Sequence, residues 1–315
     1  MKTKIFIDGK EGTTGLQIFE RFEKRDDLEI LLIDEDKRKD LNERARLINE
    51  SDITFLCLPD AAAKEAVSLV KNENVRIIDA STAHRVDPEW DYGFPELSKA
   101  HREAIKSSKR VANPGCYASG FISLVYPLMQ AGVLGDDYPL TAHAVSGYSG
   151  GGKKMIAALE SGGKTKEMYS PRQYALTQAH KHLPEMQTVC GLKYKPMFNP
   201  IVDDYYAGMV VSVPLVARAM AKKCTPADIH SILSEHYDGQ HFVKVMELFG
   251  KDTLPDGFLA ANTLEGTNDV QLFVFGNDEQ ILLCSRLDNL GKGASGAAVQ
   301  NMNIMLGLDE GTGLE

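Results

Sequence analysis

The chain has 315 residues, which is enough for two domains with a substantial core. Its hydrophobic share of 43% and charged share of 25% are ordinary for a soluble globular protein. A net charge of −9 at pH 7 argues against a nucleic-acid partner. No apolar run approaches the ~20 residues that a membrane helix needs, which argues against a membrane protein. The composition predicts a metabolic enzyme that acts on small molecules.

The N-terminus and the cysteines indicate a compartment. The opening stretch, MKTKIFIDG, leads directly into a strand, so we expect no secretory signal. The five cysteines are odd in number and contain no CxxC pair, at positions 57, 116, 190, 224 and 284. This pattern is typical neither of a disulfide framework nor of a zinc site, and it predicts a reducing compartment, the cytoplasm.

The first eighty residues alternate between short apolar runs and amphipathic stretches. The apolar runs predict strands over 4–8, 28–34, 52–58 and 75–79. The stretches between them predict helices over 16–25, up to 47–48 and over 61–70. This alternation predicts an α/β fold with a doubly wound parallel sheet.

A glycine loop joins the first strand to the first helix. Gly9, Gly12 and Gly15 are spaced three apart around Thr13 and Thr14. Glycines let backbone N–H groups approach a pyrophosphate, and the helix N-terminus then faces the anion. Glycines here could also serve only to relieve strain in the turn, but the strand–loop–helix context favours dinucleotide binding. We add Pro59, which follows the third strand, to the cofactor-binding candidates.

The residues after the second strand should select the cofactor. Asp34 stands where an acid would accept a hydrogen bond from a ribose hydroxyl, which favours NAD. Lys37 and Arg38 follow and could hold a 2′-phosphate, which favours NADP, although such a run is also typical of a solvated helix start. The residues alone leave both cofactors open.

Two further segments are candidates for contact with a ligand. After the fourth strand, DASTAHRV (79–86) carries Ser81 and Arg85, and open α/β sheets bind ligands at this edge. The planar fork of Arg85 suits a phosphate or a carboxylate, although most loop arginines are merely solvated. Further along, SGYSGGGKK (146–154) contains four glycines, which predict either close approach to a ligand or a plain linker.

Cys116 is the candidate nucleophile. It follows Asn113-Pro114-Gly115, which ends one element, and it precedes an apolar run that predicts a helix. In the first helical turn the positive end of the helix favours a thiolate, which lowers the pKa of the cysteine. The alternative is that Cys116 is a small buried core residue, as most free cysteines are.

Two histidines could supply the proton transfer that a thiolate enzyme needs. His180 and His182 lie in AHKHLPE, and histidine titrates near neutral pH. Their spacing matches no metal motif, and Glu185 is the one nearby acid that could complete a metal site, so we predict no metal.

Seven segments together resemble the N-acetyl-γ-glutamyl-phosphate reductase family, in its shorter subfamily. They are GKEGTTG, DASTAHR, YGFPEL, NPGCYAS, SGYSGGGKK, HKHLPE and the closing DNLGKGASGAAVQNMNIMLGL. The family belongs with the aspartate-semialdehyde dehydrogenases, so the resemblance implies an N-terminal Rossmann domain over 1–115 plus 288–315. It implies a mixed α/β catalytic and oligomerisation domain over 116–287, and a homodimer or homotetramer.

The resemblance also implies roles for the candidate residues. Cys116 would form a thioester with an acyl-phosphate substrate, and one of the two histidines would be the acid/base, with a slight preference for His182. Arg85 would bind substrate phosphate, and we place Ser81, Asn113 and Glu185 with it as substrate-binding candidates. Ser81 is also a cofactor-binding candidate. Ser146, Gly147, Asn289 and Gly293 would line the nicotinamide half of the cofactor.

The implied reaction is the NADPH-dependent reduction of N-acetyl-L-glutamyl 5-phosphate to the 5-semialdehyde, in arginine biosynthesis. The resemblance implies NADP, although Asp34 by itself would favour NAD. Two alternatives stay open at this point: another acyl-phosphate reductase, such as an aspartate-semialdehyde dehydrogenase, and a non-catalytic NAD(P)-binding regulator.

Overall fold

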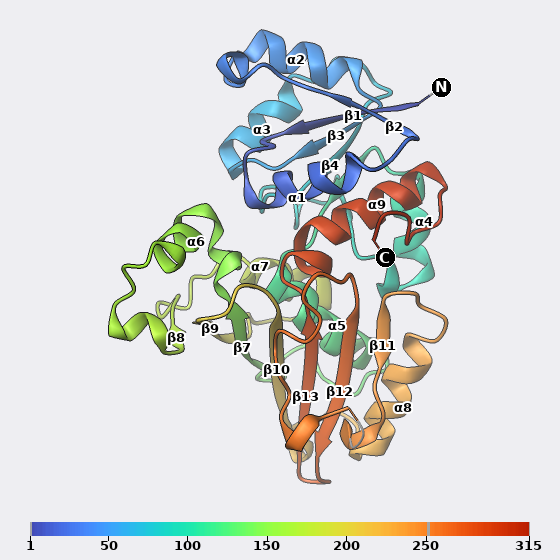
Figure 1. Ribbon diagram of the computed structural model, residues 1–315. Helices are drawn as coiled ribbons and strands as arrows, with labels where there is room; N and C mark the ends of the chain where they lie inside the picture. Colours follow the sequence, from blue (N-terminus) through green and yellow to red (C-terminus); the bar gives the residue numbers. More distant parts are fainter. Residues whose placement is uncertain (1, 251–252, 315) are drawn as a thin grey trace. The chain divides into compact units, whose positions relative to one another are not determined.

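The computed structural model describes residues 2–250 and 253–314, which form two compact units. The first unit holds the residues up to Gly115 together with those from Ala294 onward, and the second spans Cys116–Gly293. Each unit is built on one sheet (Figure 1).

The sheet of the first unit is parallel throughout. Its strands are ordered β2-β1-β3-β4-β6-β5, and each neighbouring pair runs in the same direction. The strands are β1 (Thr3–Asp8), β2 (Leu28–Leu31), β3 (Ile53–Leu56), β4 (Arg76–Asp79), β5 (Asp91–Tyr92) and β6 (Arg110–Ala112). The predicted doubly wound parallel sheet is confirmed.

Helices cover both faces of this sheet. They are α1 (Thr13–Phe22), α2 (Leu41–Glu50), α3 (Asp60–Ser68), α4 (Lys99–Ser107) and α9 (Gly296–Leu306). In Figure 1, α2 and α3 lie on one face, while α1 and α9 lie on the other, with α9 packed beside α1 and α4. A cluster under α2 and α3 includes Phe6, Ile48, Leu56 and Ile77, so the apolar runs predicted as strands do form the core.

Several element boundaries differ from the sequence prediction. The first helix begins at Thr13, three residues early, because the Gly12 carbonyl already accepts the first helical hydrogen bond, from Leu16. The helix ends at Phe22 and a tight turn follows, in which Arg25 N–H donates to the Phe22 carbonyl. The second strand pairs with β1 only as far as Leu31, so Asp34 lies beyond it.

The last helix is part of the first unit's core. Every residue of α9 from Gly296 to Met305 is buried, including Gln300, Asn301 and Asn303. Asn301 Nδ2 donates to the Gly93 carbonyl at 2.9 Å, and Asn303 Nδ2 donates to the Thr312 carbonyl at 2.9 Å. The amide nitrogens of these two buried side chains have hydrogen-bond partners, as burial requires, and these bonds fix the position of the helix in the first unit.

The second unit has a mixed sheet, ordered β11-β12-β13-β10-β7-β9-β8. Its strands are β7 (Thr141–Gly147), β8 (Arg172–Gln173), β9 (Met197–Asp203), β10 (Met209–Val216), β11 (Val243–Val245), β12 (Val270–Gly276) and β13 (Gln280–Leu287). The β7–β9 and β11–β12 pairs are parallel, and the other pairs are antiparallel. The mixed α/β prediction is confirmed for this part of the chain.

One long helix lies against this sheet. It is α5 (Cys116–Gln130), which packs on β10 and β13 and is flanked by α7 (Leu183–Cys190) and α8 (Pro226–His236). The helix α6 (Gly152–Glu160) follows β7 (Figure 1).

The described residues also form short helical turns. The 3₁₀ turns lie at 35–37, 95–97, 148–151, 166–169, 217–219, 248–250 and 255–257, and a π-helical turn lies at 291–295. None of the helices in residues 2–250 and 253–314 is long and apolar enough to cross a membrane.

Candidate active site

Cys116 is the first residue of α5, as the sequence predicts. The N–H groups of a first helical turn carry partial positive charge, so the position favours an anionic sulfur. Cys116 is only partly buried. For the other four cysteines, at 57, 190, 224 and 284, burial raises the pKa of the thiol, which makes them poor nucleophiles.

A glycine turn packs directly on this cysteine. A Cβ added to Gly293 would lie 2.7 Å from the Cys116 Cβ and 3.0 Å from the Asp288 carbonyl oxygen. The first distance is shorter than real Cβ contacts and the second is very tight, so the turn at 291–295 can pack on Cys116 because position 293 has no side chain. The structure thus brings together two residues that are far apart in the sequence.

The two histidines lie where the chain enters α7. The rings of His180 and His182 are perpendicular, with centroids 4.8 Å apart, and the backbone N–H of His182 donates to Nδ1 of His180 at 3.1 Å. A backbone N–H can only donate, so Nδ1 of His180 accepts and a neutral His180 ring carries its proton on Nε2. His180 can therefore donate through Nε2 in this arrangement, but it cannot take up a proton there.

Tyr117 connects the cysteine to the histidines. Its ring contacts His180 and His182 edge-on or tilted, with centroid separations of 5.7 and 5.9 Å. Its hydroxyl accepts a hydrogen bond from the Tyr174 hydroxyl at 2.9 Å. Burial, with the Cys116 charge as a further contribution, raises the pKa of both tyrosines. Because Tyr117 follows Cys116 directly, its ring sets the histidine pair beside the start of α5.

Glu185 lies in the first turn of α7 and is fully buried. It is placed three residues after His182, within one turn of the same helix start. Among the described residues, no group of three or more His, Cys, Asp and Glu side chains is arranged to hold a metal ion.

The glycine-rich segment 146–152 is an ordered turn rather than a linker. It closes β7, passes through the 3₁₀ turn 148–151 and begins α6. Asn289 ties it down, because its Nδ2 donates to Ser149 Oγ at 2.9 Å and its Oδ1 accepts from Gly208 N–H at 2.8 Å. Gly147 approaches the Tyr206 carbonyl so closely that a Cβ would lie 2.5 Å from it, and Ser146 Oγ donates to the Gly147 carbonyl.

In the first unit, the glycine loop is built by close backbone contacts. Gly9 has a left-handed φ of +89°, and a Cβ there would lie 2.4 Å from the Cys57 carbonyl oxygen. A Cβ on Gly15 would lie 2.5 Å from the Gly9 carbonyl oxygen. Gly12 is the N-cap of α1 and supplies no side chain to cap it, with Thr13 and Thr14 in the first turn. The first N–H groups of α1 thus form a cradle that fits an anionic pyrophosphate.

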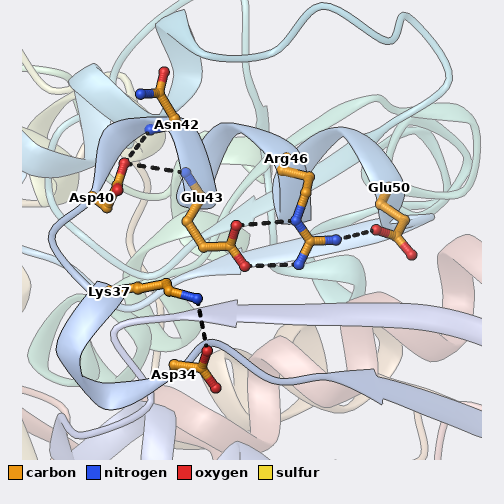
Figure 2. A network of polar contacts seen from close by, with 7 residues as sticks. All are labelled: Asp34, Lys37, Asp40, Asn42, Glu43, Arg46 and Glu50. Carbon is orange, nitrogen blue, oxygen red and sulfur yellow. Dashed lines mark hydrogen bonds and ion pairs between the residues drawn. The ribbon is translucent and has the colours of Figure 1, made fainter.

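The residues predicted to select the cofactor form two separate ion pairs. Asp34 and Lys37 pair at 3.1 Å across one 3₁₀ turn, which raises the pKa of Lys37, while Arg38 pairs with Glu35 at 3.8 Å (Figure 2 shows the first pair). The Asp34 side chain is 70% exposed. Figure 2 also shows Asp40 capping α2, whose Arg46 is held between two glutamates. The negative charge of Asp34 is therefore balanced by Lys37 rather than by a backbone amide.

The loop after β4 is fixed by backbone carbonyls and by carboxylates. Arg85 is buried, and its Nε donates to the Asn113 carbonyl at 2.9 Å and its Nη2 to the Ala80 carbonyl at 3.1 Å. The Asn113 side chain donates to the Ala294 carbonyl and accepts from Asn301. Ser81 donates to Asp79. Pro59 is the N-cap of α3 and does not contribute a side-chain hydrogen bond.

Comparison with known proteins adds the family. Two family models match: the semialdehyde dehydrogenase NAD binding domain over residues 33–108, and the semialdehyde dehydrogenase dimerisation domain over residues 116–289. The chain is 50% identical to N-acetyl-gamma-glutamyl-phosphate reductase 2 of a Nostoc species, with 99% of each chain covered. It is 49% identical to the N-acetyl-gamma-glutamyl-phosphate reductase of Burkholderia ambifaria, with 96% of each covered.

The chain belongs to the N-acetyl-γ-glutamyl-phosphate reductase family. Solved structures agree on the fold: aspartate semialdehyde dehydrogenase II from Vibrio cholerae superposes with a TM-score of 0.71 at 15% identity, over 97% of this chain and 98% of that one. The enzyme from Francisella tularensis gives 0.72 at 15% identity, over 96% and 100%. A member of this reductase family is an oxidoreductase, and the NAD-binding domain indicates a nicotinamide dinucleotide cofactor.

The sequence analysis did not single out several buried or partly buried residues that lie near the candidate site. Tyr117 and Tyr174 are one example, and their hydroxyl pair joins residues 57 positions apart. Lys292 is another: its side chain is almost fully buried beside Gly293, with Nζ 5.7 Å from the centroid of the Phe242 ring. The segments NPGCY and GKGAS made Tyr117 and Lys292 possible candidates from the sequence. Their contacts with Tyr174 and Phe242 could not be predicted, because those residues lie far away in the chain.

Gly293→Ala should reduce kcat by roughly a hundredfold, because the new Cβ must displace Cys116 and misplacing a reacting group by about 1 Å costs about that much. Steady-state kinetics on the purified variant, with circular dichroism to confirm folding, measures the effect. Gly163→Ala is the matched control, since a Cβ there meets nothing closer than 3.8 Å. A Gly293→Ala enzyme with the wild-type kcat would show that the contact does not set the position of the thiol.

Proposed function

We propose that the chain reduces N-acetyl-L-glutamyl 5-phosphate to N-acetyl-L-glutamate 5-semialdehyde and phosphate with NADPH, in arginine biosynthesis. The observation that carries this proposal is the half-buried Cys116 at the start of α5, with Tyr117 in contact with the histidine pair. Family membership at about 50% identity over nearly the full length supports the substrate. The alternative, aspartate semialdehyde dehydrogenase, rests on relatives only 15% identical, which share the fold.

The chemistry begins with the thiolate. Cys116 Sγ attacks the acyl carbon, the bond from that carbon to the phosphate oxygen breaks, and phosphate leaves with the electron pair, so a thioester remains. A nicotinamide held by Ser146, Gly147, Asn289 and Gly293 would supply the hydride that the thioester carbon accepts. The resulting thiohemiacetal then loses its C–S bond, the semialdehyde departs and the thiolate is restored. The first N–H groups of α5 lie where they could stabilise the oxyanion.

The two histidines take different roles in this proposal. His182 is the acid/base that exchanges protons with Cys116 and with the substrate oxygen. His180 holds the substrate oxygen by donating from Nε2, a role that its fixed tautomer supports because Nδ1 is already accepting from the His182 amide. Arg85 binds the anionic group of the substrate, with Ser81, Asn113 and Glu185 around the bound molecule.

The decisive experiment runs the reaction backward. Purified protein is incubated with N-acetylglutamate 5-semialdehyde, phosphate and NADP, and absorbance at the reduced-nicotinamide band is followed. Reduction of NADP that requires both N-acetylglutamate 5-semialdehyde and phosphate supports the proposal. A faster rate with aspartate semialdehyde favours the alternative reductase, and no turnover with either aldehyde contradicts an enzyme of this class.

NADP is the cofactor that the charges around the 3₁₀ turn 35–37 favour. The Asp34 carboxylate is neutralised by Lys37, so it repels a 2′-phosphate less than a lone acid would, and Arg38 offers a charged donor.

The rest of the dinucleotide has its own proposed site. Gly9, Gly12 and Gly15 hold the pyrophosphate, and the nicotinamide half is held by Ser146, Gly147, Asn289 and Gly293. Thr13, Thr14 and Pro59 complete the dinucleotide site.

Arg38→Ala should raise KM for NADPH about tenfold and leave KM for NADH nearly unchanged, because only NADPH carries the 2′-phosphate that the guanidinium would bind. Initial rates with each cofactor measure both constants. Arg46→Ala is the matched control, since its guanidinium is held by Glu43 and Glu50. Equal effects on both cofactors, or a wild-type enzyme that prefers NADH, would mean that Asp34 governs the pocket.

We also propose a homodimer or homotetramer in the cytoplasm. The match to a dimerisation domain over 116–289 supports assembly, and the second unit exposes large apolar side chains such as Tyr169, Leu176 and Tyr194. All five cysteines are free, which suits a reducing compartment. Light scattering coupled to size-exclusion chromatography measures the assembly, and a mass of one chain would contradict it.

A further inference from the structure

A buried carboxylate and a buried histidine lie at the end of β4, in the loop that carries Arg85. Asp79 is the last residue of β4 and is fully buried. Its Oδ2 accepts from His84 Nδ1 at 2.6 Å and from Ser81 Oγ at 2.7 Å, while its Oδ1 accepts from Ser81 N–H at 2.9 Å. The reaction proposed above makes no use of His84.

The position of the loop depends on these hydrogen bonds. A carboxylate taken out of water must be matched by donors, and Asp79 finds three of them within the next five residues. A second carboxylate, Asp60, accepts from the N–H and the hydroxyl of Thr82. The backbone from 80 to 84 is thus held at several points by acidic side chains, which leaves the loop little freedom.

The chain's one tryptophan fixes the plane of the histidine ring. The rings of His84 and Trp90 are stacked, with centroids 4.1 Å apart and planes 10° from parallel. Nδ1 of His84 faces Asp79, so the stacking and the hydrogen bond together define one orientation of the imidazole. A residue held in this way can transmit a fixed position to its neighbour in the chain.

That neighbour is Arg85. Its guanidinium is oriented by two carbonyl groups, one of which belongs to Ala80 in the same loop. A shift of the loop therefore moves both the Arg85 backbone and one acceptor of its side chain. The carboxyl end of β4 is also the edge at which open parallel sheets bind their ligands.

We infer that His84 is a positioning residue for anion binding: through its hydrogen bond to Asp79 and its stacking on Trp90, it holds the loop in which Arg85 receives the anionic group of the substrate. This inference rests on the proposed role of Arg85. His84 itself does not touch the substrate, so its loss should weaken the binding of the anion and leave the chemical step intact.

The test measures KM for inorganic phosphate in the reverse reaction of the full-length protein. His84→Leu removes the donor to Asp79, and we expect KM for phosphate to rise roughly tenfold, the effect of losing one hydrogen bond to a charged group. The kcat at saturating phosphate and KM for NADP should stay within about twofold of wild type. His84→Asn, whose amide nitrogen can replace Nδ1 as the donor, should restore KM for phosphate to near the wild-type value.

Two controls separate this inference from the proposed function. Arg85→Met tests the anion site itself, and an unchanged KM for phosphate in that variant would refute the role of Arg85. His101→Leu removes a half-buried histidine of α4 whose ring pairs with Ser98, and it should leave KM for phosphate unchanged.

Trp90 reports whether the loop remains folded. A red shift of its emission in His84→Leu would show that the turn around Trp90 has opened. In that case the KM for phosphate of His84→Asn decides whether the hydrogen bond to Asp79 positions Arg85. If Arg85→Met raises KM for phosphate while His84→Leu does not, the inference is overturned. It is also overturned if His84→Leu lowers kcat alone, or if His84→Asn is as impaired as His84→Leu.

Discussion

We expect Cys116→Ser to lower kcat by more than about a hundredfold while the affinity for NADPH stays at the wild-type value. A serine hydroxyl is a far weaker nucleophile than a thiolate at pH 7, and the helix end that favours an anionic sulfur is not enough to ionise an alcohol. The glycine loop belongs to the first unit and Cys116 to the second, so the proposed pyrophosphate site does not include the thiol. Steady-state kinetics and fluorescence titration with NADPH measure the two effects.

Cys224→Ser is the matched control for this variant. Cys224 is buried beside the start of α8, and burial raises the pKa of its thiol, so its replacement should leave kcat unchanged. A Cys116→Ser enzyme that keeps more than about a hundredth of wild-type kcat would rule out the covalent mechanism.

His182→Asn should lower kcat by roughly 10²–10⁴, the usual contribution of a general acid–base. His180→Asn should act mainly on KM for the aldehyde, because His180 is restricted to donating from Nε2. The pH dependence of kcat should lose one ionisation in His182→Asn and keep it in His180→Asn. Rates measured across pH for the three enzymes give both comparisons.

His143→Asn, on an exposed position of β7, serves as the control for a histidine outside the site. A larger loss of kcat in His180→Asn than in His182→Asn would reverse the two roles and keep the mechanism. Wild-type kcat in both variants would remove the histidine pair from the reaction.

The sequence predicts correctly those features of the fold and of the candidate site that depend on residues adjacent in the chain. The position of Cys116 follows from the Pro-Gly pair before it and the apolar run after it, and the structure puts it at the first residue of α5. The strands and helices of the first eighty residues follow from periodicity in the same way. The ends of these elements are predicted less accurately. The start of α1, for example, depends on a hydrogen bond from Leu16 N–H to the Gly12 carbonyl, which the residue types alone do not indicate.

Features that depend on distant residues could not be predicted. Asp8 looks like an ordinary strand end, yet its carboxylate is bound by Arg44 through Nε at 3.0 Å and Nη2 at 2.9 Å. Burial raises the pKa of Asp8 in spite of this partner. The contact between Gly293 and Cys116 joins residues at opposite ends of one unit. Such pairs are set by the three-dimensional packing of the chain, which leaves no local pattern.

The return of the chain to the first unit has a consequence for synthesis. The first sheet is complete once Ala112 has been made, but α9, whose buried residues belong to that unit, is translated only after the whole of the second unit. At ribosomal rates of about 5–20 residues per second, residues 116–293 delay it by on the order of ten seconds or more. During that interval the nascent first unit exposes the apolar surface that α9 later covers, while the second unit is free to fold as a whole. We expect a fragment ending at Gly115 to aggregate, and the same fragment to be rescued by residues 294–315 supplied as a separate peptide.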